Sequence, residues 1–159
     1  MTIPRRVLTL LTLLLLSQRL VAQNVDVFAG YSHLHGSGWE ASATLNFTPH
    51  FGLTTDFGGY YGFLQKTAHT FLAGPRFRTP YKNGSFFAHA LFGYEKLTYP
   101  QHSFAVAIGG GYDWNLSPRF SFRVLQVEDV ITNLSFRTQN TARISSGLVF
   151  RFPKRSANK

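Results

Sequence analysis

Apolar residues alternate with polar or small residues along most of the chain after residue 23. In "WEASATLNF" (39–47) the apolar residues take every second place, and "FGLTTDFGGYY" (51–61) keeps this spacing. Successive side chains of a β-strand point to opposite faces, so the spacing predicts strands with one apolar face. No stretch keeps the 3.6-residue period of an amphipathic helix. The pattern gives eight predicted strands: 24–33, 38–48, 51–62, 68–78, 85–95, 103–115, 119–129 and 141–152.

Two similar hexapeptides, "NFTPHF" (46–51) and "NLSPRF" (115–120), lie between predicted strands, and "RTPYKNGSFF" (78–87) is a looser third copy. Proline fixes its own φ, and asparagine and hydroxyl side chains bond the nearby backbone, so each copy predicts a tight reversal. The other connections are expected to be longer, the longest near "VITNLSFRTQN" (130–140). Short turns at one end and longer loops at the other are typical of outer-membrane barrels.

Residues 1–23 have a different pattern. Arg5 and Arg6 precede the apolar run "VLTLLTLLLL" (7–16), and a polar stretch follows. This order predicts a cleaved secretory signal peptide, because the apolar run is too short to span a bilayer as a helix. The expected domains are a signal peptide (1–23), a barrel (24–152) and a short basic periplasmic tail (153–159), with export by the Sec route.

Composition narrows the class further. Only 14% of the 159 residues are charged, whereas a soluble domain has about 25%. There is no cysteine, so disulfides and thiolate chemistry are excluded. The net charge of +9 comes largely from basic residues near the two ends of the chain, and nucleic-acid binding is therefore not expected.

A soluble lipocalin or avidin barrel would also be an alternating meander, with its aromatic face turned inward. Four features favour the opposite arrangement, with the apolar face in lipid. They are the predicted signal peptide, the low content of charged residues, the absence of cysteine and the sequence of the last strand. Aromatic residues near predicted strand ends favour it too, since outer-membrane barrels carry aromatic girdles at both interfaces. These residues are Trp39, Tyr61, Tyr94, Trp114 and Phe152.

The stretches "FLAGPRFR" (71–78), "FAVAIGGGYDW" (104–114) and "SSGLVFRF" (145–152) resemble the small eight-stranded outer-membrane barrels of the OmpA and OmpX type from Gram-negative bacteria. The resemblance implies an all-β, eight-stranded antiparallel up-and-down transmembrane barrel in the outer membrane. It also implies an assembly signal at Gly147, Phe150 and Phe152, read by the barrel-assembly machinery. Membrane lipids and lipopolysaccharide would be the surroundings of a monomer.

Charged residues on the predicted inward face should pair into a plug, because an eight-stranded lumen is only wide enough for its own side chains. Arg76 is the expected centre of this plug. A water-filled channel is the alternative. The alternation breaks at "VLQVED" (124–129), which suggests a β-bulge. The predicted lumen network consists of Asp26, Glu40, Asp56, Arg76, His89, Glu95, Asp113, Arg123, Arg143 and Arg151.

Two further groups of residues could supply chemistry. Histidines near the outer rim could bind a metal ion, but imidazoles are ordinary at a wet rim, and no metal or other cofactor is expected. Ser32, His33 and Glu40 supply the residue types of a lipase, yet Ser32 and His33 should point to opposite faces, and catalysis is not expected. The rim histidines are His33, His35, His69 and His102.

The sequence thus predicts an outer-membrane barrel with a plugged lumen and a structural or surface-interaction role. A narrow porin or a transporter of small hydrophobic solutes is the first alternative. A lipid-modifying enzyme of the outer membrane is the second.

Overall fold

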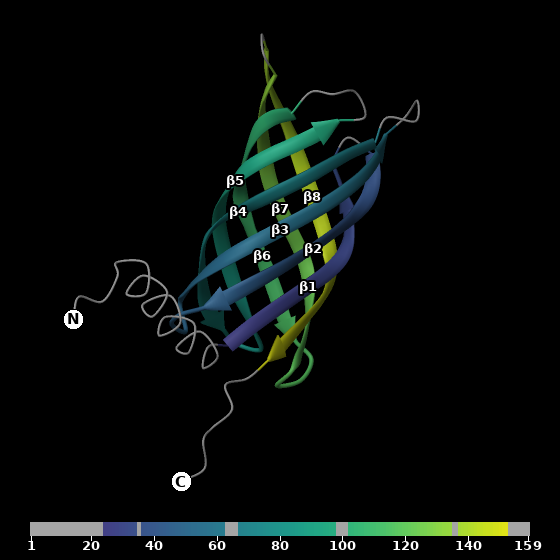
Figure 1. Ribbon diagram of the computed structural model, residues 1–159. Coiled ribbons are helices and arrows are strands. Elements are labelled where there is room, and N and C mark those ends of the chain that lie inside the picture. The colour runs from purple at the N-terminus through teal and green to yellow at the C-terminus, as the bar shows by residue number, and fades with distance from the viewer. Residues whose placement is uncertain (1–23, 35, 63–66, 98–101, 135–136, 153–159) are drawn as a thin grey trace, which may run out of the picture.

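The computed structural model describes residues 24–34, 36–62, 67–97, 102–134 and 137–152, which form one closed sheet (Figure 1). Consecutive strands pair antiparallel, and β1 also pairs with β8. The predicted eight-stranded up-and-down barrel is therefore confirmed. The strands are β1 (Asn24–His33), β2 (Gly36–Asn46), β3 (Phe51–Gly62), β4 (Thr67–Tyr81), β5 (Gly84–Leu97), β6 (His102–Asn115), β7 (Phe120–Leu134) and β8 (Arg137–Phe152).

The first strand begins and the last strand ends at the same end of the barrel. Asn24, where β1 begins, and Phe152, where β8 ends, lie at the end called here the terminal end, at the bottom of Figure 1. The opposite end is called the loop end. In the part of the chain that the structure describes, no helix has the length and apolar character needed to cross a membrane. The predicted signal peptide and tail lie outside the described residues.

The repeated hexapeptides form the same turn at the terminal end. The Phe47 and Thr48 amides both donate to the Phe51 carbonyl, and the Thr48 hydroxyl accepts from the Phe51 amide at 2.9 Å. Leu116, Ser117 and Phe120 repeat these contacts, with 3.0 Å between the Phe120 amide and the Ser117 hydroxyl oxygen. The hydroxyl residue of each copy thus closes the turn, as predicted.

The third reversal is tighter than its sequence suggested. Strand β4 runs on to Tyr81 and β5 starts at Gly84, so only Lys82 and Asn83 connect them. Lys82 has a φ of 49°, the left-handed conformation that two-residue hairpins require. Most of "RTPYKNGSFF" (78–87) is therefore strand.

The outward face is apolar and the inward face is largely polar. Large hydrophobic side chains such as Leu53, Ile108 and Leu148 are about half exposed on the outside. Thr44, Thr54 and many charged side chains are buried inside. The girdle residues predicted at strand ends are all exposed on the outer wall, which is the arrangement that suits contact with lipid.

The predicted bulge lies in β7 at Val124 and Leu125, which together face Ser146 of β8. Both apolar side chains point outward, and the Ser146 hydroxyl donates to the Arg123 carbonyl at 3.0 Å. The extra residue reverses the order of faces after Arg123. Glu128 consequently points into the lumen, whereas Asp129 is exposed.

The expectation of longer connections at the loop end was wrong. Two residues lie between β1 and β2, and four lie between β3 and β4 and between β5 and β6, so these connections are no longer than the four-residue turns at the terminal end. Residues 130–140 were expected to be the longest loop, but β7 continues to Leu134 and β8 starts at Arg137, with these two residues paired. Thr, Asn and Gln occupy both faces of this hairpin, so it shows no apolar alternation. The backbone hydrogen bonds between β7 and β8 nevertheless continue to the end of the hairpin, because they do not depend on apolar alternation.

The lumen also contains an apolar cluster that the sequence reading did not predict. Side chains from β4, β5, β6 and β7 pack inside with those of Leu34 and Tyr60. The lumen is thus filled partly by hydrophobic packing and partly by charge. The other members of the cluster are Ala68, Leu72, Leu91, Ala105, Ala107 and Val130.

The charged lumen as the candidate functional site

Inward-facing ionic side chains form two groups at different heights. The one near the terminal end is called the basic cluster: Arg76, Arg78, Arg123, Arg151, Asp26 and Asp113. The one nearer the middle of the barrel is called the acidic cluster: Glu40, Asp56, Glu128, Arg143 and His89.

Asp113 joins two arginines in the basic cluster. Its Oδ2 is 2.9 Å from an Arg76 terminal nitrogen, and its Oδ1 is 2.8 Å from Arg123 Nε. All three side chains are almost fully buried. Arg76 also donates to the Thr44 hydroxyl, which lies 2.8 Å from the Thr54 hydroxyl across the β2–β3 pair.

Two phenylalanines turned into the lumen pack against the arginines. The Arg76 and Arg123 guanidinium carbons lie 4.1 and 4.3 Å from the centre of the Phe87 ring. The Phe28 ring lies 4.1 Å from the Arg123 guanidinium carbon. The negative face of an aromatic ring attracts a cation, so these stacks offset repulsion between the two arginines.

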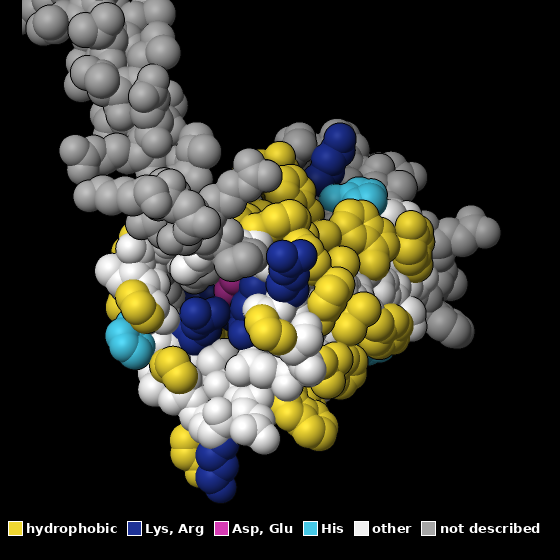
Figure 2. All heavy atoms as spheres, turned by 90° about the horizontal axis from the view of Figure 1, so that it is seen from below, with side chains coloured by type: hydrophobic (Ala, Val, Ile, Leu, Met, Phe, Trp, Pro, Cys, Tyr) yellow, Lys and Arg dark blue, Asp and Glu magenta, His cyan; other side chains and the backbone are white. Residues whose placement is uncertain are grey.

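Two more arginines lie at the terminal mouth of the lumen. Arg78 pairs with Asp26 at 3.1 Å, and Arg151 donates to the Asn115 side-chain oxygen at 2.7 Å. Figure 2 views this end from below: basic side chains gather around its centre, and hydrophobic side chains cover much of the outside. The mouth therefore presents positive charge.

Arg143 is the hub of the acidic cluster and is fully buried. One terminal nitrogen donates to Asp56 at 2.8 Å, and the other to Glu128 at 2.8 Å. Its Nε donates to Glu128 and lies 3.7 Å from Glu40. Arg143 thus contacts three carboxylates, whereas Arg76 pairs with one, so the expectation that Arg76 is the centre was wrong.

Neutral donors complete the acidic cluster. The Gln126 amide donates to Glu40 at 2.7 Å and to Glu128 at 2.9 Å, and the Ser145 hydroxyl donates to Glu40 at 2.5 Å. A ring nitrogen of His89 lies 2.5 Å from Glu128. Carboxylates outnumber guanidinium groups here, and these donors supply the hydrogen bonds that buried oxygens require.

Solved structures with the same architecture were found by comparison of the fold. Neisserial surface protein A matches with a TM-score of 0.65 at 11% identity, over 82% of this chain and 97% of that one. The N-terminal barrel domain of Pseudomonas aeruginosa OprF matches with a TM-score of 0.57 at 12% identity, over 81% and 97% of the two chains. The attachment invasion locus protein Ail of Yersinia pestis matches at 0.50 and 17% identity, over 82% and 97%.

The chain has the fold of the small outer-membrane β-barrels. Its resemblance to that group, first seen in the three sequence stretches, is confirmed at the level of the fold. No protein-family model matches the sequence, and no curated protein matches it. Because these identities are low, the likeness to solved structures establishes the barrel architecture and not an activity.

Within this outer-membrane type of barrel, nine of the ten predicted lumen residues lie in or beside the two clusters. The tenth, Glu95, lies closer to the loop end and accepts a hydrogen bond from Thr132 at 2.9 Å. Five residues that belong to the clusters or contact them were not predicted. They are Arg78, Glu128, Gln126, Phe28 and Phe87.

The sequence features that could have predicted these five residues differ from one to the next. Arg78 lies two residues after Arg76, so the period of two would have placed it inside. Gln126 and Glu128 follow the bulge, and their orientation depends on where the extra residue falls. Phe28 and Phe87 are aromatic, and the pattern therefore suggested the lipid face.

The barrel does not bring the alternative constellations together in its described part. Ser32 is buried and bonded to Ser145 at 2.8 Å, while His33 is exposed on the other face. His69 is exposed, whereas His35 and the His102 side chain lie outside the described residues. Among the described residues, no three His, Asp or Glu side chains are arranged so that they could hold a metal ion.

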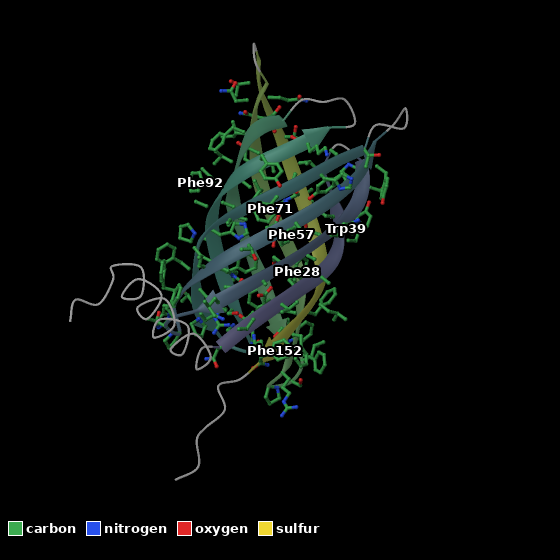
Figure 3. All side chains as sticks on the ribbon, viewed as in Figure 1. Phe28, Trp39, Phe57, Phe71, Phe92 and Phe152 are labelled. Carbon is green, nitrogen blue, oxygen red and sulfur yellow. The ribbon has the colours of Figure 1, made fainter. Side chains whose placement is uncertain are left out.

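The predicted assembly-signal residues lie at the end of β8. Gly147 pairs with Gly30 of β1, and a Cβ on Gly147 would lie 2.4 Å from the Gly30 Cα, so this close approach requires glycine. The Phe150 and Phe152 rings are 4.5 Å apart, and Figure 3 labels Phe152 near the bottom of the barrel. A role in assembly remains a prediction.

Proposed function

We propose that this protein is an outer-membrane barrel whose lumen is closed by its own side chains and that it has a structural or surface-interaction role. The apolar outer wall suits hydrocarbon. The observation that carries the proposal is the burial of the lumen side chains: Arg123, Gln126, Arg143, Leu72 and Leu91 are each at most 1% exposed. Residues lining a water-filled channel would be accessible to solvent.

Conductance tests the closed lumen. Protein refolded into planar bilayers should give no stable ohmic steps, because charge and apolar packing both fill the interior. Gel mobility with and without boiling, on the same preparation, would verify that the barrel is folded. Stable conductance from protein with the folded mobility would support the narrow-porin alternative instead.

In the proposed orientation the terminal end faces the periplasm and the loop end faces the outside. The absence of cysteine allows a direct test. Thr138→Cys at the loop end should react with an impermeant maleimide on intact cells. Lys82→Cys at the terminal end should react only after the outer membrane is permeabilised. The reverse labelling would overturn the orientation.

We further propose that the end of β8 is read by the assembly machinery. Phe152→Ala should lower the amount of barrel in the outer membrane far more than it lowers the stability of refolded protein. Phe77→Ala removes another exposed aromatic side chain and serves as the control. Equal loss for both variants would point to a general need for aromatic side chains.

A non-enzymatic role is part of the proposal. A serine nucleophile needs a base within hydrogen-bond reach, and Ser32 instead bonds Ser145 inside the lumen. Labelled lipid A incubated with folded protein should therefore remain intact. Turnover that Ser32→Ala abolishes would favour the lipid-modifying alternative.

A further inference from the structure

A groove of about 270 Å3 lies on the outer wall, across β2 to β5 and toward the loop end. Labelled side chains of this wall, Trp39, Phe57 and Phe71, lie near one another in Figure 3. The groove is lined by the outward-facing side chains of Trp39, Phe57, His69, Phe71, Tyr94 and Lys96, together with Gly58 and Thr70.

One side of the groove is formed by the Trp39 indole, which packs over a glycine of the neighbouring strand. Trp39, Gly59, His69 and Lys96 follow one another across the four strands in register. The Trp39 indole leans over Gly59, where a Cβ would lie 2.6 Å from the indole nitrogen. Glycine at this position therefore makes room for the Trp39 indole, which lines the groove.

Aromatic rings form the side of the groove farther from the loop end. Phe57, Phe71 and Tyr94 follow one another across β3, β4 and β5. The ring centres of Phe57 and Phe71 are 4.7 Å apart, and those of Phe71 and Tyr94 are 5.6 Å apart. This continuous aromatic row suits an apolar chain.

Two basic residues form the side nearer the loop end. His69 and Lys96 are paired in register, each two residues farther toward the loop end than Phe71 and Tyr94. Both are exposed, and none of the ion pairs among the described side chains involves Lys96. The rim therefore favours an anionic group above the apolar surface.

We propose that this groove binds a phosphorylated acyl lipid of the outer leaflet, the lipid A portion of lipopolysaccharide. An acyl chain would lie along Phe57 and Phe71, and a phosphate would meet Lys96 and His69. The basic residues lie nearer the loop end and the aromatic row lies farther from it. A lipid of the outer leaflet has its phosphate and its acyl chain in the same order. The choice of leaflet rests on the proposed orientation.

The experiment measures lipid binding to the folded full barrel in detergent by native mass spectrometry. The probes are lipid A with its phosphates and the same lipid with the phosphates removed. Lys96→Gln should weaken binding of the phosphorylated lipid roughly tenfold and leave binding of the other unchanged. Phe71→Ala should weaken binding of both.

Lys82→Gln is the matched control, since this lysine lies at the terminal end over the Tyr81 ring. Equal effects of Lys82→Gln and Lys96→Gln would overturn the inference, as would equal binding of both lipids by the unmodified barrel. A dimer in place of a lipid adduct would assign the groove to a second copy. If Phe71→Ala loses the folded gel mobility, Phe71→Leu replaces it, with the same expectation.

The outcome is separable from that of the proposed function. Conductance or reversed maleimide labelling would contradict the closed lumen or the orientation. Absence of lipid binding, with a silent lumen and the expected labelling, would contradict the groove alone.

Discussion

The two clusters of the lumen solve opposite problems of charge. The basic cluster holds four arginines and two aspartates, whereas the acidic cluster holds one arginine, three carboxylates and His89. In the basic cluster the surplus guanidinium groups lie against phenylalanine rings or bond Asn115. In the acidic cluster the surplus oxygens accept from neutral amide and hydroxyl groups.

This difference shows that a narrow lumen does not need to match every charge with its opposite. Each surplus is held by the group that suits it, because aromatic faces attract cations and N–H or O–H donors bind carboxylates. The two clusters should consequently be destabilised by different substitutions. Loss of the single arginine should harm the acidic cluster most, and loss of the shared aspartate should harm the basic one.

The largest effect is expected for Arg143→Met. It should lower the free energy of unfolding by about 3–5 kcal/mol, because three buried carboxylates lose their guanidinium partner. Arg76→Met should have a smaller effect, since Asp113 keeps Arg123. Urea unfolding of protein refolded in vesicles would measure both. An equal or larger loss for Arg76→Met would remove the distinction between the clusters.

Asp113→Asn should come next, with a loss of about 2–3 kcal/mol, since two buried arginines lose their shared acceptor. Asp129→Asn is the control, because that carboxylate lies on the outer wall opposite Ile108, where loss of the charge should not lower stability. Adding Arg76→Met to Asp113→Asn should cost less than the sum of the two changes. Strict additivity would show that the pair is not coupled.

Phe87→Leu should lower stability by about 1–2 kcal/mol, since the ring that faces both Arg76 and Arg123 is removed. Phe86→Leu changes the neighbouring residue on the outer wall and keeps both stacks. The same unfolding assay compares them. If Phe86→Leu proves the more harmful, stacking is not what holds the surplus arginines.

The smallest effect is expected for Arg78→Gln, below about 1 kcal/mol, because this arginine is 20% exposed at the mouth. The loss should shrink further as salt is raised, since water and ions reach the pair. Unfolding at low and high salt would measure this. A large loss of stability that does not depend on salt would show that Arg78 contributes as much as the buried arginines.

The barrel could be predicted from sequence because alternation and turn residues both point to it. The repeated hexapeptides gave the turns at the terminal end, and the period of two placed Asp56, Arg123 and Arg143 inside. Alternation fails where both faces are polar, and the β7–β8 hairpin was therefore mistaken for a loop.

The clusters could be predicted only in part. Sequence position gives the face of a residue but not its height or its partner across the lumen. Arg143 reaches Asp56, 87 residues earlier in the chain, because the barrel closes and not because of any local pattern. The inward Phe28 and Phe87 break the rule that aromatic residues face lipid, since here their partners are guanidinium groups.

The bulge in β7 has a consequence for how this strand tolerates insertions and deletions. Removing Val124 would turn the side chain of every later residue in the strand to the opposite face of the sheet. Gln126 and Glu128 would then face hydrocarbon, while Val127 would enter the lumen. A loop absorbs a lost residue locally, but this strand would carry the error up to Leu134, so its exact number of residues matters as much as their identity.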